Sequence, residues 1–134
     1  MIKLNKKVLI LVVDDDNILV WPLENKLTAE GFDVIKAVDG GEGLQLALTQ
    51  HPDLILLDLL MPKVDGFTML RKLREDPWGA HATVIILTNV SDPTKVAEGM
   101  NLGGDSGAYE YLVKTNWSLD DVVARIKQKL EINT

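Results

Sequence analysis

The stretch that decides the fold reads Asp53-Leu54-Ile55-Leu56-Leu57-Asp58-Leu59-Leu60-Met61-Pro62-Lys63-Val64-Asp65-Gly66. Four apolar residues run without a break into the carboxylate of Asp58, and prolines bound the segment on both sides. A short apolar run of this kind is typical of a strand that is buried on both faces, as in a parallel sheet. Ligands of open α/β sheets bind beyond the carboxyl ends of the strands. Asp58 is therefore a candidate functional residue, although Asp also favours turns.

The composition narrows the class of protein. A chain of 134 residues with 46% apolar and 25% charged residues predicts one globular domain, with a core over about residues 7–131. The net charge of −6 argues against nucleic-acid binding, which needs basic patches. The absence of cysteine excludes disulfides and thiolate metal sites. No apolar run approaches the roughly 20 residues of a membrane span, so no membrane partner is expected.

Similar apolar runs recur along the chain and alternate with segments of helical periodicity. The expected strands are Val8–Val13, Val34–Val38, Leu54–Leu57, Val84–Leu87 and Tyr109–Val113. The expected helices are Ile18–Glu30 with Asn17 as its N-cap, Glu42–Gln50, Gly66–Arg74, Thr94–Leu102, and a last helix that follows Ser118 and extends to Leu130. This alternation predicts a parallel sheet with helices on both faces.

Polar residues stand where these strands end. Asp14 and Asp15 follow the first strand and Asp58 follows the third, whereas Thr88 and Lys114 end the fourth and fifth. Each placement alone has an ordinary explanation, since aspartates start turns and a lone lysine is usually solvated. The carboxyl ends of parallel strands share one edge of the sheet, so these side chains can converge there. Turn formation and solvation do not readily explain why so many polar residues stand at the same edge of the sheet, which favours a functional site.

The residue types indicate phosphoryl chemistry. Three carboxylates without histidine or cysteine form a hard oxygen site that suits Mg²⁺ or Mn²⁺. A carboxylate can itself attack a phosphoryl group and form an aspartyl-phosphate. A threonine hydroxyl and a lysine ammonium can bind the phosphoryl oxygens. The sequence contains no glycine-rich nucleotide cradle, so the phosphoryl donor is not expected to be bound as ATP.

Several motifs together resemble the receiver domain of two-component response regulators, the CheY-like family. They are Val12-Val13-Asp14-Asp15-Asp16, Asp58-x-x-Met61-Pro62-x-x-Asp65-Gly66, Thr88, and Gly107-Ala108 before Tyr111-Leu112-Val113-Lys114. The resemblance covers nearly the whole chain and all the expected strands. It implies a flavodoxin-like fold, which is a doubly wound five-stranded parallel sheet of order 2-1-3-4-5 with helices on both faces.

The resemblance also implies roles for the acidic residues. Asp58 is expected to accept a phosphoryl group from the phosphohistidine of a sensor histidine kinase or phosphotransfer protein. Asp14 and Asp15, together with Asp58 and the backbone carbonyl of Leu60, are expected to hold Mg²⁺ (or Mn²⁺). The protein would then catalyse only its own phosphorylation and dephosphorylation and would not turn over an external substrate.

The remaining residues of the resemblance form a switch. Thr88 matches the switch hydroxyl, Lys114 the phosphate-pairing lysine, and Tyr111 the aromatic that turns inward when Thr88 moves; Asn89 lies beside them at the phosphoryl group. The responding face is expected to comprise the fourth helix, fifth strand and fifth helix, over residues 94–102 and 109–130. A downstream protein would bind this face in the cytoplasm. No output domain follows the last helix, so we expect a stand-alone receiver or a piece of a larger protein.

Three features depart from the family pattern. Thr115 follows Lys114 where the family usually has a proline, often in a cis peptide, so either the loop is rerouted or a strained peptide is held in place. The segment between Thr88 and Lys114 is longer than expected, with the excess at Gly103–Gly107. Leu60, two residues after Asp58, cannot position a hydrolytic water as a polar residue could.

Two other functions compete with a phosphoacceptor. A haloacid-dehalogenase-like phosphohydrolase also uses a strand-end aspartate with Mg²⁺, but it would need a second aspartate where Leu60 stands. A degenerate receiver that acts as a phosphorylation-independent adaptor would have lost part of the constellation, which is complete here.

Overall fold

The fold is described from a computed structural model that covers residues 7–59, 61, 64–89 and 109–130. Its elements in chain order are β1 Leu9–Val13, α1 Asn17–Ala29, β2 Asp33–Ala37, α2 Gly40–Gln50, β3 Leu54–Leu57, α3 Gly66–Glu75, the 3₁₀ turn η1 Gly79–His81, β4 Val84–Thr88, β5 Tyr109–Val113, the 3₁₀ turn η2 Lys114–Asn116, and α5 Leu119–Lys129. The helix expected over Thr94–Leu102 and the loop Gly103–Gly107 lie outside the described residues.

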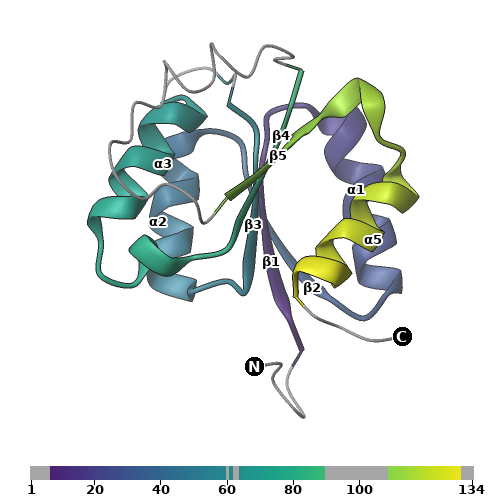
Figure 1. The fold of residues 1–134 in the computed structure, drawn as a ribbon, viewed down its shortest axis with the longest axis horizontal. Coiled ribbons are helices and arrows are strands. Elements are labelled where there is room, and N and C mark those ends of the chain that lie inside the picture. Colours follow the sequence, from purple (N-terminus) through teal and green to yellow (C-terminus); the bar gives the residue numbers. More distant parts are fainter. Residues whose placement is uncertain (1–6, 60, 62–63, 90–108, 131–134) are drawn as a thin grey trace.

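The strands form one parallel sheet in the order β2-β1-β3-β4-β5. Helices α2 and α3 cover one face of the sheet, and α1 and α5 cover the other (Figure 1). The order and the helices on both faces confirm the predicted doubly wound fold. Because every strand runs the same way, all strand ends that carry the predicted site residues meet at one edge.

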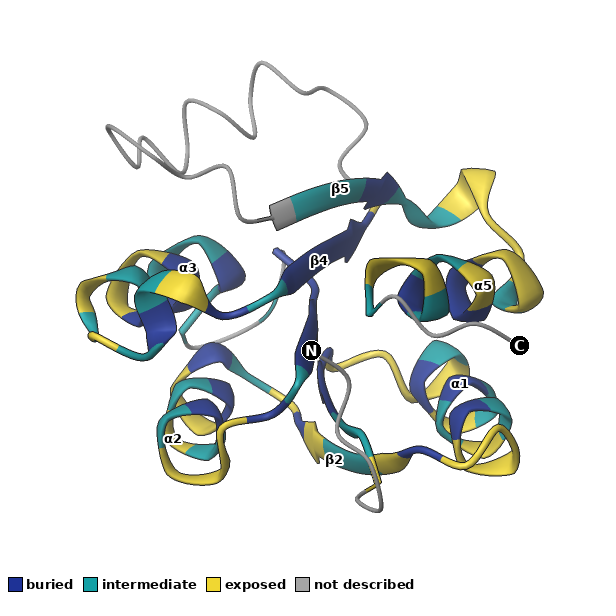
Figure 2. Ribbon diagram, turned by 60° about the horizontal axis from the view of Figure 1, so that its bottom comes forward, coloured by how far each residue is buried: buried dark blue, intermediate teal, exposed yellow. Residues whose placement is uncertain are grey.

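Two buried clusters hold the helices against the sheet. Alternate side chains of each strand point to opposite faces, so β1 and β3 send odd-numbered residues toward α2 and α3 and even-numbered residues toward α1 and α5. Every residue of β3 and β4 is buried, and β4 is uniformly so in Figure 2. Burial on both faces explains why these strands read as unbroken apolar runs rather than as an alternating pattern.

Side-chain caps fix where the helices begin, and one predicted cap was wrong. Asp16, not Asn17, is the N-cap of α1, and its carboxylate accepts the N–H of Ile18 at 3.0 Å. The predicted cap at Ser118 is confirmed, because its hydroxyl accepts the N–H of Asp121 while the Asp121 carboxylate accepts the Ser118 N–H. None of the described helices has the length and apolar character needed to cross a membrane.

Candidate functional site

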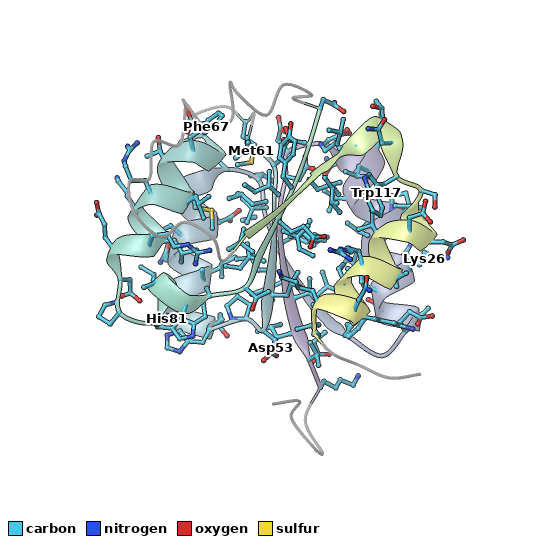
Figure 3. All side chains as sticks on the ribbon, viewed as in Figure 1. Lys26, Asp53, Met61, Phe67, His81 and Trp117 are labelled. Atoms are coloured by element: carbon cyan, nitrogen blue, oxygen red, sulfur yellow. The ribbon has the colours of Figure 1, made fainter. Side chains whose placement is uncertain are left out.

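The predicted site residues converge at the carboxyl edge of the sheet. The register pairs Val13 with Leu57, which places the following residues Asp14 and Asp58 on adjacent strands. Their backbones are held there, since the Asp58 N–H donates to the carbonyl of Val13 at 2.9 Å. Figure 3 shows Asp53, at the start of β3, on the opposite edge from Met61 and Trp117. Asp58 follows the last residue of β3 and therefore lies at the carboxyl edge that the topology predicts.

Lys114 joins the two buried carboxylates. Its Nζ lies 2.9 Å from Oδ2 of Asp14 and 3.3 Å from Oδ2 of Asp58. The side chains are nearly buried, with exposed fractions of 10% for Lys114, 5% for Asp14 and 6% for Asp58. The other carboxylate oxygen of Asp14 accepts the backbone N–H of Asp16 at 2.9 Å. Two adjacent acids therefore share one cation that the chain itself supplies.

Burial and charge shift two of these groups. Burial raises the pKa of Asp14 above its ordinary value, against the opposing hydrogen bonds from Lys114 and the Asp16 N–H, and the nearby charge of Asp58 raises it further. Burial by itself would lower the pKa of Lys114, but hydrogen bonding and attraction to Asp14 and Asp58 outweigh it, so that pKa is raised. The site therefore favours the charged form of Lys114 and disfavours the ionised form of Asp14.

The acidic residues form a pocket that could hold a cation. Asp14, Asp15 and Asp58 each offer one carboxylate oxygen, and these oxygens all lie within 4.8 Å of one another. Asp14 and Asp58 are buried, whereas Asp15 is exposed and can be reached from solvent. A set of oxygen donors only fits a hard divalent cation such as Mg²⁺. The fourth predicted ligand, the carbonyl of Leu60, lies outside the described residues.

A hollow beside this pocket was not foreseen from the sequence. It is small, with room for about one water molecule, and it is partly open to solvent. Its lining combines the two buried acids with apolar side chains of the sheet and α1: Val12, Val13, Asp14, Leu19, Leu23, Leu56, Leu57, Asp58 and Leu87. Only the packing of α1 on the sheet creates it, so no local pattern could have indicated it.

The predicted switch residues occupy neighbouring strands. Thr88 ends β4 and is fully buried, and Asn89 after it is exposed. The register pairs Ile86 with Tyr111, and Thr88 lies two positions further along β4, so Thr88 and Tyr111 belong to the same face of the sheet. Tyr111 is half-buried and packs against the cluster on the α2–α3 face. The two side chains thus lie on the same face of adjacent strands, and their coupled movement stays a prediction.

The chain after β5 takes a rerouted path at the first departure from the family pattern. The described residues contain no cis peptide bond. Instead Lys114–Asn116 forms the 3₁₀ turn η2, in which the Trp117 N–H bonds to the Lys114 carbonyl. This turn presents Lys114 to the acids without a proline at Thr115.

Comparison with known proteins agrees with this geometry. The sequence matches the response regulator receiver domain family over residues 10–127. It is 42% identical over 120 residues to the response regulator PleD of Caulobacter vibrioides, covering 88% of this chain but a quarter of PleD. The receiver domain of the Francisella response regulator 1452 shares 31% identity and a TM-score of 0.76, covering 93% of this chain and 98% of that one.

A third relative is similar in fold. The receiver domain of the sensor histidine kinase PA1611 of Pseudomonas aeruginosa has a TM-score of 0.79 at 24% identity, over 94% of this chain and 99% of that one, and its structure holds a magnesium ion in the active-site cleft. The family match, the sheet order and the acidic pocket of Asp14, Asp15 and Asp58 lead to one conclusion: the chain belongs to the response regulator receiver domain family.

Proposed function

We propose that Asp58 is the phosphoacceptor of this receiver domain. In the proposed reaction a carboxylate oxygen of Asp58 attacks the phosphorus of a phosphohistidine. An O–P bond forms, the N–P bond breaks, and its electron pair stays on the histidine of the donor. A two-component response regulator implies a histidine kinase as donor, and a separate phosphotransfer protein could serve equally. The protein is not a conventional enzyme, because the phosphoryl group ends on its own side chain.

One observation carries this proposal. Asp58 is a nearly buried carboxylate at a strand end, 3.3 Å from the Lys114 ammonium and grouped with two further acids. Among the described residues, Asp14, Asp15 and Asp58 form the group of three carboxylates that lie close enough together to bind one divalent cation.

Asp14, Asp15 and Asp58 would hold Mg²⁺ (or Mn²⁺), with the Leu60 carbonyl as a further ligand by family resemblance. The magnesium ion in the cleft of the related PA1611 domain supports this choice. When bound, such an ion neutralises the charge on the phosphoryl oxygens during in-line transfer. Lys114 would move from its contact with Asp14 to a phosphoryl oxygen and add a second positive charge.

The phosphorylated domain would signal through a surface. Thr88 would donate to a phosphoryl oxygen, with Asn89 beside it, and Tyr111 would follow Thr88 inward. The face formed by β5, α5 and the helix expected over residues 94–102 would then bind a downstream protein in the cytoplasm. The proposal treats residues 7–131 as the core of one domain, in keeping with the family match over residues 10–127.

Intact-mass measurement tests the assignment. With acetyl phosphate and Mg²⁺, the wild-type chain should gain one phosphoryl group and Asp58→Asn should gain none. Asp53→Asn is the matched control, because Asp53 lies at the other end of β3 and should leave the yield unchanged. Equal labelling of Asp58→Asn would refute the assignment.

The same experiment separates the competing functions. A stable, stoichiometric label supports the phosphoacceptor. Continuous release of phosphate without accumulated label would indicate a phosphohydrolase, and no label in the wild-type chain would indicate a phosphorylation-independent adaptor.

A further inference from the structure

Helix α3 lies against the main chain of the proposed phosphoacceptor at a single glycine. Gly66 is the first residue of α3, and its N–H donates to the carbonyl of Leu59 at 3.1 Å. A Cβ atom built on Gly66 would lie 2.2 Å from the carbonyl oxygen of Asp58 and 2.7 Å from Cα of Leu59. These atoms belong to the backbone, so no rotation of a side chain could relieve the overlap. Any larger residue must move the main chain of Asp58 or the start of α3.

A second glycine lies against the segment before α3. The N–H of Gly40, at the start of α2, donates to the carbonyl of Val64 at 2.6 Å. A Cβ on Gly40 would lie 2.6 Å from that carbonyl and 2.7 Å from the carbonyl of Asp65. Asp65 in turn caps α3 by accepting the N–H of Thr68 at 2.8 Å. The start of α3 therefore lies in close backbone contact with both α2 and the end of β3.

We propose that Gly40 and Gly66, which we call the glycine clamp, are positioning residues that set the place of Asp58 for phosphoryl transfer. This inference rests on the proposed function of Asp58. The clamp allows α3 to approach until its first residue touches the carbonyl of Asp58. Because the carboxylate and the carbonyl belong to one residue, a displacement of the main chain carries the carboxylate with it.

The site tolerates little displacement. The Asp58 carboxylate lies 3.3 Å from Lys114 and its oxygen is grouped within 4.8 Å of those of Asp14 and Asp15. An ordinary Cβ contact with a carbonyl oxygen requires more than 3.0 Å, so an alanine at position 66 must open the contact of 2.2 Å substantially. A misplacement of about 1 Å can slow a reaction by about 100-fold when the reacting atoms depend on alignment.

Gly79 offers a matched control for this test. A Cβ on Gly79 would lie 2.1 Å from the carbonyl oxygen of Leu73, an overlap as severe as that at Gly66. Gly79 is also buried, but it follows α3 and precedes β4, at the edge of the sheet where the strands begin. Gly66→Ala and Gly79→Ala should therefore both lower stability, whereas only Gly66→Ala should disturb Asp58.

The experiment compares the two variants with the wild-type full chain. Urea unfolding measures the folded fraction of each, and the rate of phosphorylation by acetyl phosphate is measured at saturating Mg²⁺ and expressed per folded molecule. Calorimetric titration with Mg²⁺ supplies a second reading that does not depend on the reaction. We expect Gly66→Ala to react at least about tenfold more slowly and to bind Mg²⁺ more weakly, with Gly79→Ala within about twofold of wild type in both.

Each outcome has a definite meaning. A Gly66→Ala variant that reacts as fast as wild type per folded molecule, or a Gly79→Ala variant that is equally slow, would overturn the clamp. Should Gly66→Ala fail to fold, Gly40→Ala is judged by the same criterion, with the same loss of rate expected. Absence of label on the wild-type chain would overturn the proposed function and the glycine clamp with it. If the wild-type chain is labelled, the two variants test the glycine clamp alone.

Discussion

The ammonium nitrogen of Lys114 lies 2.9 Å from Oδ2 of Asp14, so a cation from the chain itself lies among the acids of the pocket. Three carboxylates close together repel one another, and burial of two of them removes the solvent that would screen the repulsion. Lys114 offsets this repulsion in the absence of metal. Lys114 thus stabilises the metal-free pocket. It does so by contacting carboxylates that would also bind the metal ion, so the lysine and the ion compete for Asp14 and Asp58.

Removal of the lysine charge should destabilise the protein. Lys114→Met leaves Asp14 and Asp58 as nearly buried acids without their cation. We expect the free energy of unfolding to fall by about 2 kcal/mol, less than the roughly 3–5 kcal/mol for breaking a fully buried pair, because the site opens to solvent. Urea unfolding in EDTA measures the loss, and Mg²⁺ should recover part of it.

Lys36→Met is the control for this prediction. Lys36 pairs with Glu24 at 2.9 Å on the surface, where both side chains are partly exposed. Such a pair contributes less than about 1 kcal/mol, and Mg²⁺ should not affect its loss. Equal losses in the two variants would show that Lys114 does not compensate the acids.

The raised pKa of Asp14 predicts how stability changes with pH in the metal-free protein. Burial raises this pKa above the ordinary value of 3.8, so between the two values the folded state binds more protons than the unfolded state. The contribution of Asp14 to stability therefore falls as pH rises through this window. Asp14→Asn removes that effect. Relative to wild type, the variant should gain stability as pH rises from below 3.8 to neutral, as urea unfolding in EDTA would show.

Glu110 should show the opposite sign. The hydrogen bond from Arg125 lowers the pKa of Glu110 below 4.5, so its contribution is present at neutral pH and is lost as pH falls through the lowered value. Glu110→Gln should therefore be less stable than wild type at neutral pH and approach it in acid. If Asp14→Asn and Glu110→Gln changed with pH in the same direction, the assignment of the Asp14 shift to burial would be wrong.

Asp15 should contribute to metal binding without contributing to the core. It is exposed, so Asp15→Ala should change the free energy of unfolding by no more than about 0.5 kcal/mol. Loss of one hard ligand should weaken Mg²⁺ binding at least about tenfold, which corresponds to about 1.4 kcal/mol. Calorimetric titration measures this, and Asp33→Ala, an exposed aspartate at the start of β2, should bind Mg²⁺ like wild type. Equal affinities for Asp15→Ala and wild type would remove Asp15 from the site.

The strands and their common edge could be predicted because a strand that is buried on both faces reads as a short, unbroken run of apolar residues. Leu54–Leu57 and Val84–Thr88 are apolar throughout or nearly so, and each is a short run flanked by polar residues. Parallel order then brings Asp14 and Asp58 together without any knowledge of side-chain contacts. The part of the site that depends only on the order and direction of the strands could therefore be predicted from the sequence.

Features that depend on distances in the folded chain could not be predicted. Asp16 and Asn17 are both good capping residues, and only the backbone at the end of β1 decides that Asp16 takes this place. The contact of Lys114 with Asp14 requires the turn η2. The sequence was compatible with either a rerouted loop or a strained peptide after Lys114. The close approach of Gly66 to Asp58 arises from α3 packing on the sheet, which glycine permits but does not signal.

The last prediction concerns the switch. Thr88 and Tyr111 lie on the same face of adjacent strands, and Thr88 is fully buried beside the phosphoacceptor edge. If Thr88 moves toward a phosphoryl group it leaves space, and in a close-packed interior a neighbouring side chain fills that space in one discrete step. Tyr111 is the half-buried aromatic in position to do so. With the phosphoryl mimic beryllofluoride and Mg²⁺, we therefore expect amide chemical shifts to change along β5 and α5, far beyond the loops that contact the mimic.

Thr88→Val separates this switch from binding of the mimic. Valine has nearly the shape of threonine but no hydroxyl, so Asp14, Asp15 and Asp58 should still bind Mg²⁺ and the mimic, while nothing draws position 88 toward it. Changes near Asp58 should persist, and those over Tyr109–Leu130 should largely disappear. The wild-type response is the reference, because it shows whether β5 and α5 change at all. Shifts confined to the loops after Asp14, Asp58 and Thr88 in the wild-type protein would mean that phosphorylation here is not transmitted through Tyr111.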